Sequence, residues 1–244
     1  MNYRGIVAYR GTAYSGFQRQ KNRPSIQGEL ERVLSFLLGQ EIAIAGAGRT
    51  DAGVHALGQT FSFVSPKQIR SDFLQKANHL LPKDIEIKRL EACEDSFHAR
   101  HSSVAKEYLY RLLPNGRRPF ESDTLAQIER TDFDEFKFRE CIPLYLGTHD
   151  FRNFTTKQED VDGFVRTISK AEVVENNGIL EIGFRGNGFM TYQVRIMVGV
   201  AIKVALGQMS LEQVRDALNP TGRRILSFKA PAGGLYLKEV FYGE

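Results

Sequence analysis

Strand-like and helix-like patterns alternate along the 244 residues, and their order repeats once. Strand patterns change hydrophobicity at every second residue, whereas helical patterns return every three or four residues. In the first half they predict a strand, a helix, a half-buried strand, a shorter helix and a strand, at 3–10, 26–38, 59–63, 73–81 and 84–91. The first half is therefore expected to pack helices on a sheet.

The second half shows the same kinds of pattern, of which the strongest is a continuous apolar stripe along a helix at 194–205. Two helix starts have the form of a capping box, Asp132-x-x-Glu135 and Ser210-x-x-Gln213. Strands are expected at 104–112, 165–174, 179–185 and 234–241. The pattern at 104–112 places Tyr108 and Tyr110 on one strand face.

Strand, helix, strand, strand, helix, strand is the order of the ferredoxin-like, or split βαβ, motif. The chain is therefore predicted to be α+β, with two similar ferredoxin-like halves at 1–100 and 101–244. We expect mixed or antiparallel sheets with helices on one face and a cleft between the halves. Charged segments rich in turn residues, at 93–104 and 113–131, are the expected junctions.

The charge is mildly basic and unevenly distributed. Lys and Arg number 33 against 29 Asp and Glu, for a net charge of +4. Basic residues exceed acidic residues over 1–50 and again over 100–120. A clustered excess is typical of a surface that meets a phosphate backbone, and it is equally compatible with an ordinary solvated surface.

Cysteine usage and hydropathy limit where the protein is expected to work. The two cysteines, Cys93 and Cys141, have neither CxxC spacing nor a disulfide framework, which favours a reducing compartment. Met1 to Arg10 lacks the apolar stretch of a signal peptide. The apolar stretch from Ile196 to Ile202 is far shorter than the roughly 18 residues of a membrane span. We expect a cytoplasmic protein without membrane association.

The segment from Gly46 to Ala56 resembles neither a helix nor a strand, and it contains several polar side chains that could take part in catalysis or binding. Three glycines permit tight turns and close backbone approach, while Arg49, Asp51 and His55 crowd a short loop. A plain hairpin loop with Asp51 capping a turn would look similar. A phosphate-binding GxxxxGK[ST] string is absent from the sequence, and a lone carboxylate argues against glycosidase chemistry.

The string Gly48-Arg-Thr-Asp-Ala-Gly-Val-His-Ala56 resembles the signature of the tRNA pseudouridine synthase A (TruA) family, and the resemblance runs almost end to end. Phe17 stands where many relatives have Trp, which keeps the aromatic character. Further matching segments lie at 14–20, 25–27, 97–100, 106–110, 166–168, 194–199 and 234–237.

The resemblance implies a pseudouridine synthase fold and an enzyme that isomerises uridine to pseudouridine at positions 38, 39 and 40 of the tRNA anticodon stem-loop. It implies no cofactor and no metal, and a homodimer bound to tRNA. The target base must be flipped out of the stem-loop. Asp51 is the implied catalytic aspartate, whether it attacks C1′, adds to the base or assists elimination to a glycal. The sequence leaves these three routes open.

The remaining site residues also follow from matching positions. Arg195 is the implied cation that keeps Asp51 ionised and oriented. Tyr108 matches the active-site tyrosine, although spacing alone would leave Tyr108 and Tyr110 equal. RNA contacts are implied for four arginines, each of which could instead be a surface ion pair: Arg19, Arg49, Arg100 and Arg166.

Four further hypotheses remain to be weighed. His98 and His101 have HxxH spacing but no third ligand at a recognised spacing, so we expect no metal site. His55 could serve only to hold the signature loop in shape. A non-catalytic RNA-binding module would give Asp51 no role, and an aspartate-nucleophile hydrolase would want a second acidic group or metal ligands beside it.

Overall fold

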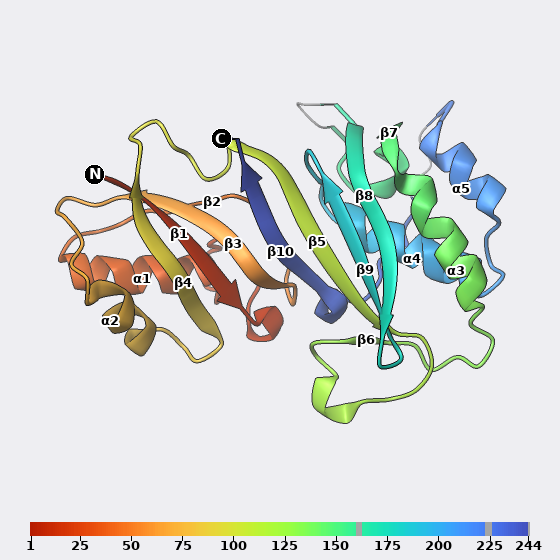
Figure 1. The fold of residues 1–244 in the computed structure, drawn as a ribbon, viewed down its shortest axis with the longest axis horizontal. Helices are drawn as coiled ribbons and strands as arrows, with labels where there is room; N and C mark the ends of the chain where they lie inside the picture. The colour runs from red at the N-terminus through yellow and green to blue at the C-terminus, as the bar shows by residue number, and fades with distance from the viewer. Residues whose placement is uncertain (160–162, 223–225, 244) are drawn as a thin grey trace. The chain divides into compact units, whose positions relative to one another are not determined.

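The computed structural model describes residues 1–159, 163–222 and 226–243. They form two compact units (Figure 1), of which the first contains residues 1–104 and the last strand from Tyr236, and the second contains Ala105–Leu235. The last strand thus groups with the first unit, whereas the sequence places it in a second half at 101–244. Its parallel pairing with a strand near residue 55 joins segments far apart in the chain, and local hydrophobic periodicity carries no information on such a partner.

The first unit has a four-strand sheet in the order β4-β1-β3-β10, with helices packed on it. β1 pairs antiparallel with both β3 and β4, and β10 pairs parallel with β3. In Figure 1, α1 lies behind the strands of this unit. The elements are β1 (Asn2–Tyr9), η1 (Gly11–Ala13), α1 (Ile26–Leu38), β2 (Ala45–Gly46), β3 (His55–Val64), α2 (Phe73–Leu80), β4 (Ile85–Cys93) and β10 (Leu235–Tyr242).

Helix α1 forms where the sequence predicts it, and both of its ends are specified locally. The Ser25 hydroxyl accepts from the Gly28 N–H, and Gly39 ends the helix in the left-handed conformation, with a φ of 75°. The apolar residues Ile26, Leu30, Val33, Leu34 and Leu38 of this helix are buried. Strand β3 differs from its prediction as a half-buried strand, because residues 59–63 are buried on both faces. It pairs with β1 along one edge and with β2 and β10 along the other, and on one of its faces the Ser62 hydroxyl accepts from the Ala99 N–H at 3.1 Å.

The second unit orders its strands β5-β9-β8-β7, all antiparallel, and β6 pairs parallel with β5. Its helices include α4, which the apolar stripe predicts. The elements are β5 (Ser103–Leu113), η2 (Pro119–Glu121), β6 (Ala126–Gln127), α3 (Glu135–Cys141), η3 (Ile142–Tyr145), β7 (Gly147–Asp150), η4 (Arg152–Phe154), β8 (Val165–Asn176), β9 (Ile179–Gly186), α4 (Gln193–Ala205), α5 (Leu211–Leu218) and η5 (Ala232–Gly234).

Helix α4 is buried on nearly all sides rather than along the predicted stripe alone. Gly199 allows this packing, because a Cβ atom there would lie 2.4 Å from the Phe228 carbonyl oxygen. On another side, the Tyr145 hydroxyl donates to the Met197 carbonyl at 2.9 Å. Within the described ranges, no helix has the length and apolar character needed to cross a membrane.

The two predicted capping boxes have different outcomes. Ser210 and Gln213 form the predicted reciprocal pair at the start of α5. Helix α3 is instead capped by Asp134, whose carboxylate accepts from the Lys137 N–H at 3.1 Å. The prediction from Asp132 is wrong because that carboxylate pairs with Arg130 at 2.6 Å. Either aspartate could cap a helix, and the position of the first helical turn decides which one does.

Candidate active site

Asp51 lies in the loop between β2 and β3, and it is half-buried. Backbone hydrogen bonds fix the loop on both sides of this residue. The Phe17 N–H donates to the Thr50 carbonyl at 3.1 Å, and the Val54 N–H donates to the Asp51 carbonyl at 3.1 Å. The Gly53 N–H reaches the Tyr14 carbonyl at 3.4 Å. Asp51 therefore projects from a tightly held turn rather than from a loose hairpin tip.

Glycine is required where the segment at 14–20 crosses this loop. Gly16 has a φ of 101°, and a Cβ atom there would lie 2.6 Å from the Thr50 carbonyl oxygen. A Cβ on Gly46 would lie 2.2 Å from the Phe17 ring. Phe17, which stands where many relatives have Trp, is buried against β2. The Phe17 ring thus packs against the base of the loop.

Three of the matching segments meet around Asp51. The segment at 14–20 contacts the signature loop as described above, and it also binds the start of α1. The Gln27 N–H donates to the Phe17 carbonyl at 2.9 Å, and the Ile26 N–H donates to the Gly16 carbonyl at 3.3 Å. Segments that the sequence presents separately therefore form one continuous support for the aspartate loop.

His55 holds the carboxyl-terminal end of the loop. It is buried, its Nδ1 accepts from the Gly11 N–H at 2.9 Å, and its ring lies 4.7 Å from that of Tyr236. The acceptor role of Nδ1 places the proton of a neutral ring on Nε2. These contacts agree with the expectation that His55 keeps the loop in shape.

His98 and His101, the two histidines with HxxH spacing, make contacts with neighbouring residues of their own segment. His98 Nδ1 accepts from the N–H groups of Arg100 and His101, at 3.1 and 3.3 Å. The two imidazole rings lie 4.4 Å apart. Among the described residues, no group of three or more His, Cys, Asp or Glu side chains is arranged to hold a metal ion.

Three of the arginines expected to contact RNA lie in the first unit, and all three are exposed: Arg19, Arg49 and Arg100. Arg19 lies 3.2 Å from the buried Glu31 carboxylate on α1. Glu31 also accepts from the Ile44 N–H at 3.1 Å. Arg19 therefore helps to neutralise a buried charge, while most of its side chain faces solvent.

Tyr108 and Tyr110 lie on β5 in the second unit and are both largely buried, at 8% and 0% exposure. The Tyr110 hydroxyl donates to the Pro231 carbonyl at 2.9 Å. Burial raises the pKa of Tyr110, and the positive charge of Arg195 lowers it in part. Tyr108 packs edge-on against Phe189 at 5.1 Å. The hydrogen bond to Pro231 and the complete burial of Tyr110 agree with a packing role for this residue in the core.

Arg195 lies in the first turn of α4 and is half-buried. Its Nε donates to the Ala230 carbonyl at 2.9 Å, and its Cζ lies 5.5 Å from the centre of the Tyr192 ring. Lys229 Nζ lies 3.9 Å from the centre of the same ring. Tyr192 has a φ of 62°, in the left-handed region that a non-glycine residue occupies at a cost. Asp51 belongs to the other unit, so its pairing with Arg195 stays a prediction.

Sequence reasoning missed Tyr192. It falls outside the predicted helix at 194–205, and no pattern in the sequence indicates a positive φ at a tyrosine. Its ring contacts with Arg195 and Lys229 become visible only once the backbone of the second unit is placed.

Arg166, the fourth expected RNA contact, is buried at the start of β8. Its Nη1 donates to the carbonyls of Gly163 and Val165, at 2.9 and 2.8 Å. These bonds tie the guanidinium to the strand entrance. A role toward RNA stays a prediction for this residue and for the three exposed arginines.

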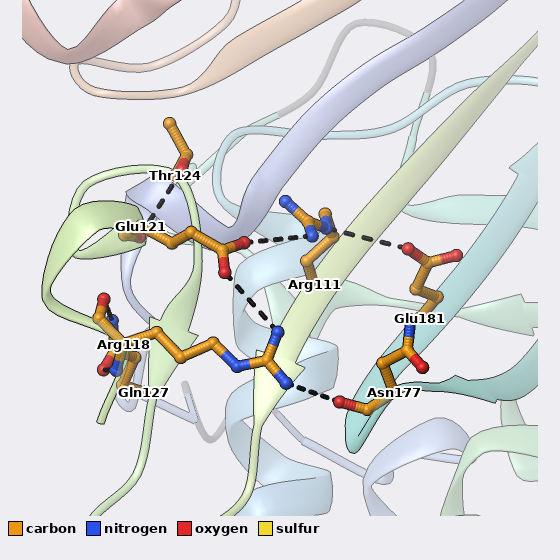
Figure 2. Close-up of polar contacts among 7 residues, drawn as sticks. All are labelled: Arg111, Arg118, Glu121, Thr124, Gln127, Asn177 and Glu181. Carbon is orange, nitrogen blue, oxygen red and sulfur yellow. Dashed lines mark hydrogen bonds and ion pairs between the residues drawn. The ribbon is translucent and has the colours of Figure 1, made fainter. Parts of the chain in front are cut away.

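The basic excess at 100–120 is balanced by acids brought in from elsewhere in the second unit (Figure 2). Arg111 lies 3.3 Å from Glu121 and 3.6 Å from Glu181, and Arg118 lies 3.4 Å from Glu121. Arg118 also donates to the Asn177 carbonyl. The sequence leaves two interpretations open here, and for Arg111 and Arg118 these ion pairs favour the ordinary solvated surface over a phosphate-binding patch.

Comparison with known proteins gives one consistent result. The family model described as tRNA pseudouridine synthase matches residues 6–102 and 142–243. The tRNA pseudouridine synthase A of Geobacillus sp. (strain WCH70) is 39% identical over 238 residues, which cover 97% of this chain and 96% of the relative. That of Streptococcus pyogenes is 39% identical over 248 residues, which cover 99% of each chain.

A solved structure, a chain of the Cbf5-Nop10-Gar1 complex, aligns with a TM-score of 0.37 and 11% identity. The alignment covers 82% of this chain and 54% of that chain, and the similarity is too weak to argue from.

An α+β fold with an aspartate on a braced loop, matched by this family model, defines a pseudouridine synthase. The predicted fold class is thereby confirmed. The chain belongs to the tRNA pseudouridine synthase family, and its relatives match it over nearly its whole length.

Proposed function

We propose that this protein isomerises uridine to pseudouridine in the anticodon stem-loop of tRNA, at positions 38, 39 and 40. The observation that carries the proposal is the full-length match to tRNA pseudouridine synthases combined with an intact signature loop around Asp51. The loop is braced by the segment at 14–20, which also matches the family and is itself bonded to the start of α1. A protein of this family that only bound RNA would have no use for a carboxylate facing a polyanion.

The reaction balances without an outside reagent. The N1–C1′ bond of uridine breaks, the uracil turns, and a C5–C1′ bond forms. The proton leaves C5 for solvent, and N1 ends with a proton. No atom is oxidised or reduced overall, so the chemistry demands an acid–base or nucleophilic group and a pocket that holds the detached base.

Asp51 is proposed as the group that starts this reaction. Each of the three routes, attack on C1′, addition to the base or assistance in forming a glycal, requires its carboxylate ionised. Arg195 is proposed as the cation that favours this ionised form, and its planar donor geometry would orient a carboxylate better than lysine. Tyr108 is proposed to contact the flipped uridine, because its ring offers a stacking face.

Binding is proposed to depend on phosphate contacts and on the shape of the tRNA. The exposed side chains of Arg19, Arg49 and Arg100 are suited to such contacts, and Arg166 is proposed as a fourth. We further propose that the protein works as a homodimer in the cytoplasm. The free thiols of Cys93 and Cys141 suit a reducing compartment.

One assay tests the proposed activity directly. Transfer RNA labelled with tritium at uracil C5 is incubated with the purified protein, and tritium released to water is counted. Release that depends on uridines 38–40 is expected, because the C5 proton must leave when the new bond forms. A binding module would retain the tRNA on a filter and release no tritium, and that outcome would refute the enzymatic proposal.

A further inference from the structure

The residue before the proposed catalytic aspartate is anchored through its side chain as well as its backbone. The Thr50 Oγ1 lies 2.7 Å from the Tyr9 hydroxyl, and both residues are buried. The Thr50 carbonyl separately accepts from the Phe17 N–H at 3.1 Å. The peptide that leads into Asp51 is therefore held at two points by groups that face away from solvent.

The anchoring group stands on the sheet rather than on another loop. Tyr9 is the last residue of β1, which pairs with β3 on one side and β4 on the other. From β3, the wholly buried Gln59 donates through Nε2 to the Gly48 carbonyl at 2.9 Å. Two neighbouring strands of one sheet thus reach the signature loop with side chains, at Gly48 and at Thr50.

The Tyr9 hydroxyl is suited to a lasting bond of this kind. Burial raises the pKa of Tyr9, so the hydroxyl stays protonated at neutral pH and can donate or accept. Its ring lies 6.2 Å from that of Phe17, which itself packs across Gly46 at the base of the loop. Phenylalanine would keep this ring contact and remove the bond to Thr50, together with the interaction between the hydroxyl and the Gln59 side chain.

We propose that Tyr9 is a positioning residue which, through the Thr50 hydroxyl, fixes the backbone that carries Asp51. The inference rests on the proposed function, since it assigns Asp51 the chemistry. Misplacement of a reacting group by about 1 Å can lower the rate by about 100-fold. Loss of one hydrogen bond at this position is therefore expected to lower kcat. Binding of tRNA, which depends on many contacts, is expected to be little affected.

Tyr9→Phe is the test, and Tyr3→Phe is its matched control. Tyr3 lies on the same strand, both tyrosines are 5% exposed, and the Tyr3 hydroxyl accepts from the Ile69 N–H at 2.9 Å, away from the loop. Each substitution removes one buried hydroxyl and the hydrogen bonding of that hydroxyl. We expect Tyr9→Phe to lower kcat for tritium release by about 10- to 100-fold with KM unchanged within about twofold, and Tyr3→Phe to leave both constants within about twofold of wild type.

Changes at Thr50 test the other end of the bond. Thr50→Val removes the hydroxyl at nearly constant shape and should reproduce the loss in Tyr9→Phe, whereas Thr50→Ser keeps the hydroxyl and should recover most of kcat. The double variant Tyr9→Phe/Thr50→Val should be no slower than the worse single variant, because the two groups form one bond. Additive losses would overturn the proposal.

Two further outcomes separate this inference from the proposed activity. Equal kcat in Tyr9→Phe and Tyr3→Phe, or a loss confined to KM, would overturn the positioning role while wild-type protein still released tritium. Absence of tritium release from wild-type protein would instead overturn the proposed function. Thermal unfolding of all variants shows whether any loss of kcat follows from unfolding, and we expect similar Tm values for Tyr9→Phe and Tyr3→Phe.

Discussion

The Arg19 guanidinium lies 3.2 Å from the Glu31 carboxylate, an ion pair in which the Arg19 side chain is 64% exposed and the Glu31 side chain 7%. The buried partner belongs to the support of the aspartate loop, because Glu31 also accepts from the Ile44 N–H and the Gln27 amide. Arg19 is thus placed both to stabilise the first unit and to present charge to a phosphate.

Arg19→Ala should lower tRNA affinity and reduce the slope of log affinity against log salt by about 1, because one phosphate contact is lost. Filter binding between about 50 and 200 mM salt measures this slope. Arg32→Ala is the control, since Arg32 lies on α1 next to Glu31 and pairs with Glu29 at 2.8 Å but matches no expected RNA contact. If Arg19→Ala lowered Tm but left the salt slope at its wild-type value, Arg19 would serve only to pair with Glu31 and would not contact a phosphate.

The two tyrosines of β5 should differ in kind when each loses its hydroxyl. Tyr110→Phe leaves the Pro231 carbonyl without its donor and should cost about 1 kcal/mol of unfolding free energy, with little effect on turnover. Tyr108→Phe should keep its packing on Phe189 and its stacking on the flipped base, and should lower kcat because the hydroxyl is lost. Urea unfolding and tritium release measure the two effects. Wild-type turnover in Tyr108→Phe together with a slow Tyr110→Phe would show that the tyrosine was wrongly chosen.

Tyr192 offers a test of backbone strain with a matched pair of substitutions. Asn and Ala both remove the ring that contacts Lys229 and Arg195, but Asn tolerates a φ of 62° better than Ala. Tyr192→Asn should therefore be more stable than Tyr192→Ala by about 0.5 to 1 kcal/mol in urea unfolding. Equal stability of the two variants would mean that the left-handed backbone is not retained without the ring.

Much of the element order follows from sequence, and the departures have local causes. The stripe of α1 and its caps are encoded within consecutive residues, so Ser25 and Gly39 can be found by inspection. The sequence predicts Asp132 as the cap of α3, whereas the structure has Asp134 in that position. Spacing alone does not show that the Asp132 carboxylate pairs with Arg130 instead. Burial on both faces of β3 depends on neighbours from distant segments.

Some residues of the candidate site can also be predicted from the sequence, and others only from the fold. Asp51 is found from a contiguous string, and the glycines around it are explained by close backbone contacts at Thr50 and Phe17. The Tyr9 hydroxyl joins the site from a strand 41 residues earlier in the chain, in a segment that reads only as alternating strand. No pattern within β1 distinguishes Tyr9 from Tyr3, since only the fold decides which hydroxyl meets the loop.

Cys141 should be unreactive in the native protein at neutral pH. Burial raises the pKa of the Cys141 thiol to about 11, so almost no reactive thiolate forms at pH 7 to 8. Because the folded state holds this proton more tightly than the unfolded chain, its contribution to stability is full below about pH 9 and is lost as the pH rises toward 11. Iodoacetamide labelling followed by mass spectrometry should modify Cys141 only after unfolding, and rapid native labelling would contradict the buried position.

Asp51→Asn should abolish turnover while leaving fold and tRNA binding in place. The amide is nearly isosteric with the carboxylate but cannot act as an anionic nucleophile or base, whichever of the three routes applies. We expect tritium release to fall by at least about four decades, or about 5.4 kcal/mol of transition-state stabilisation. The loop should persist, since it is held by backbone hydrogen bonds at Thr50, Asp51 and Gly53 and by the bond of the Thr50 hydroxyl. Filter binding and Tm provide the controls, and release at even a tenth of the wild-type rate would remove Asp51 from the chemistry.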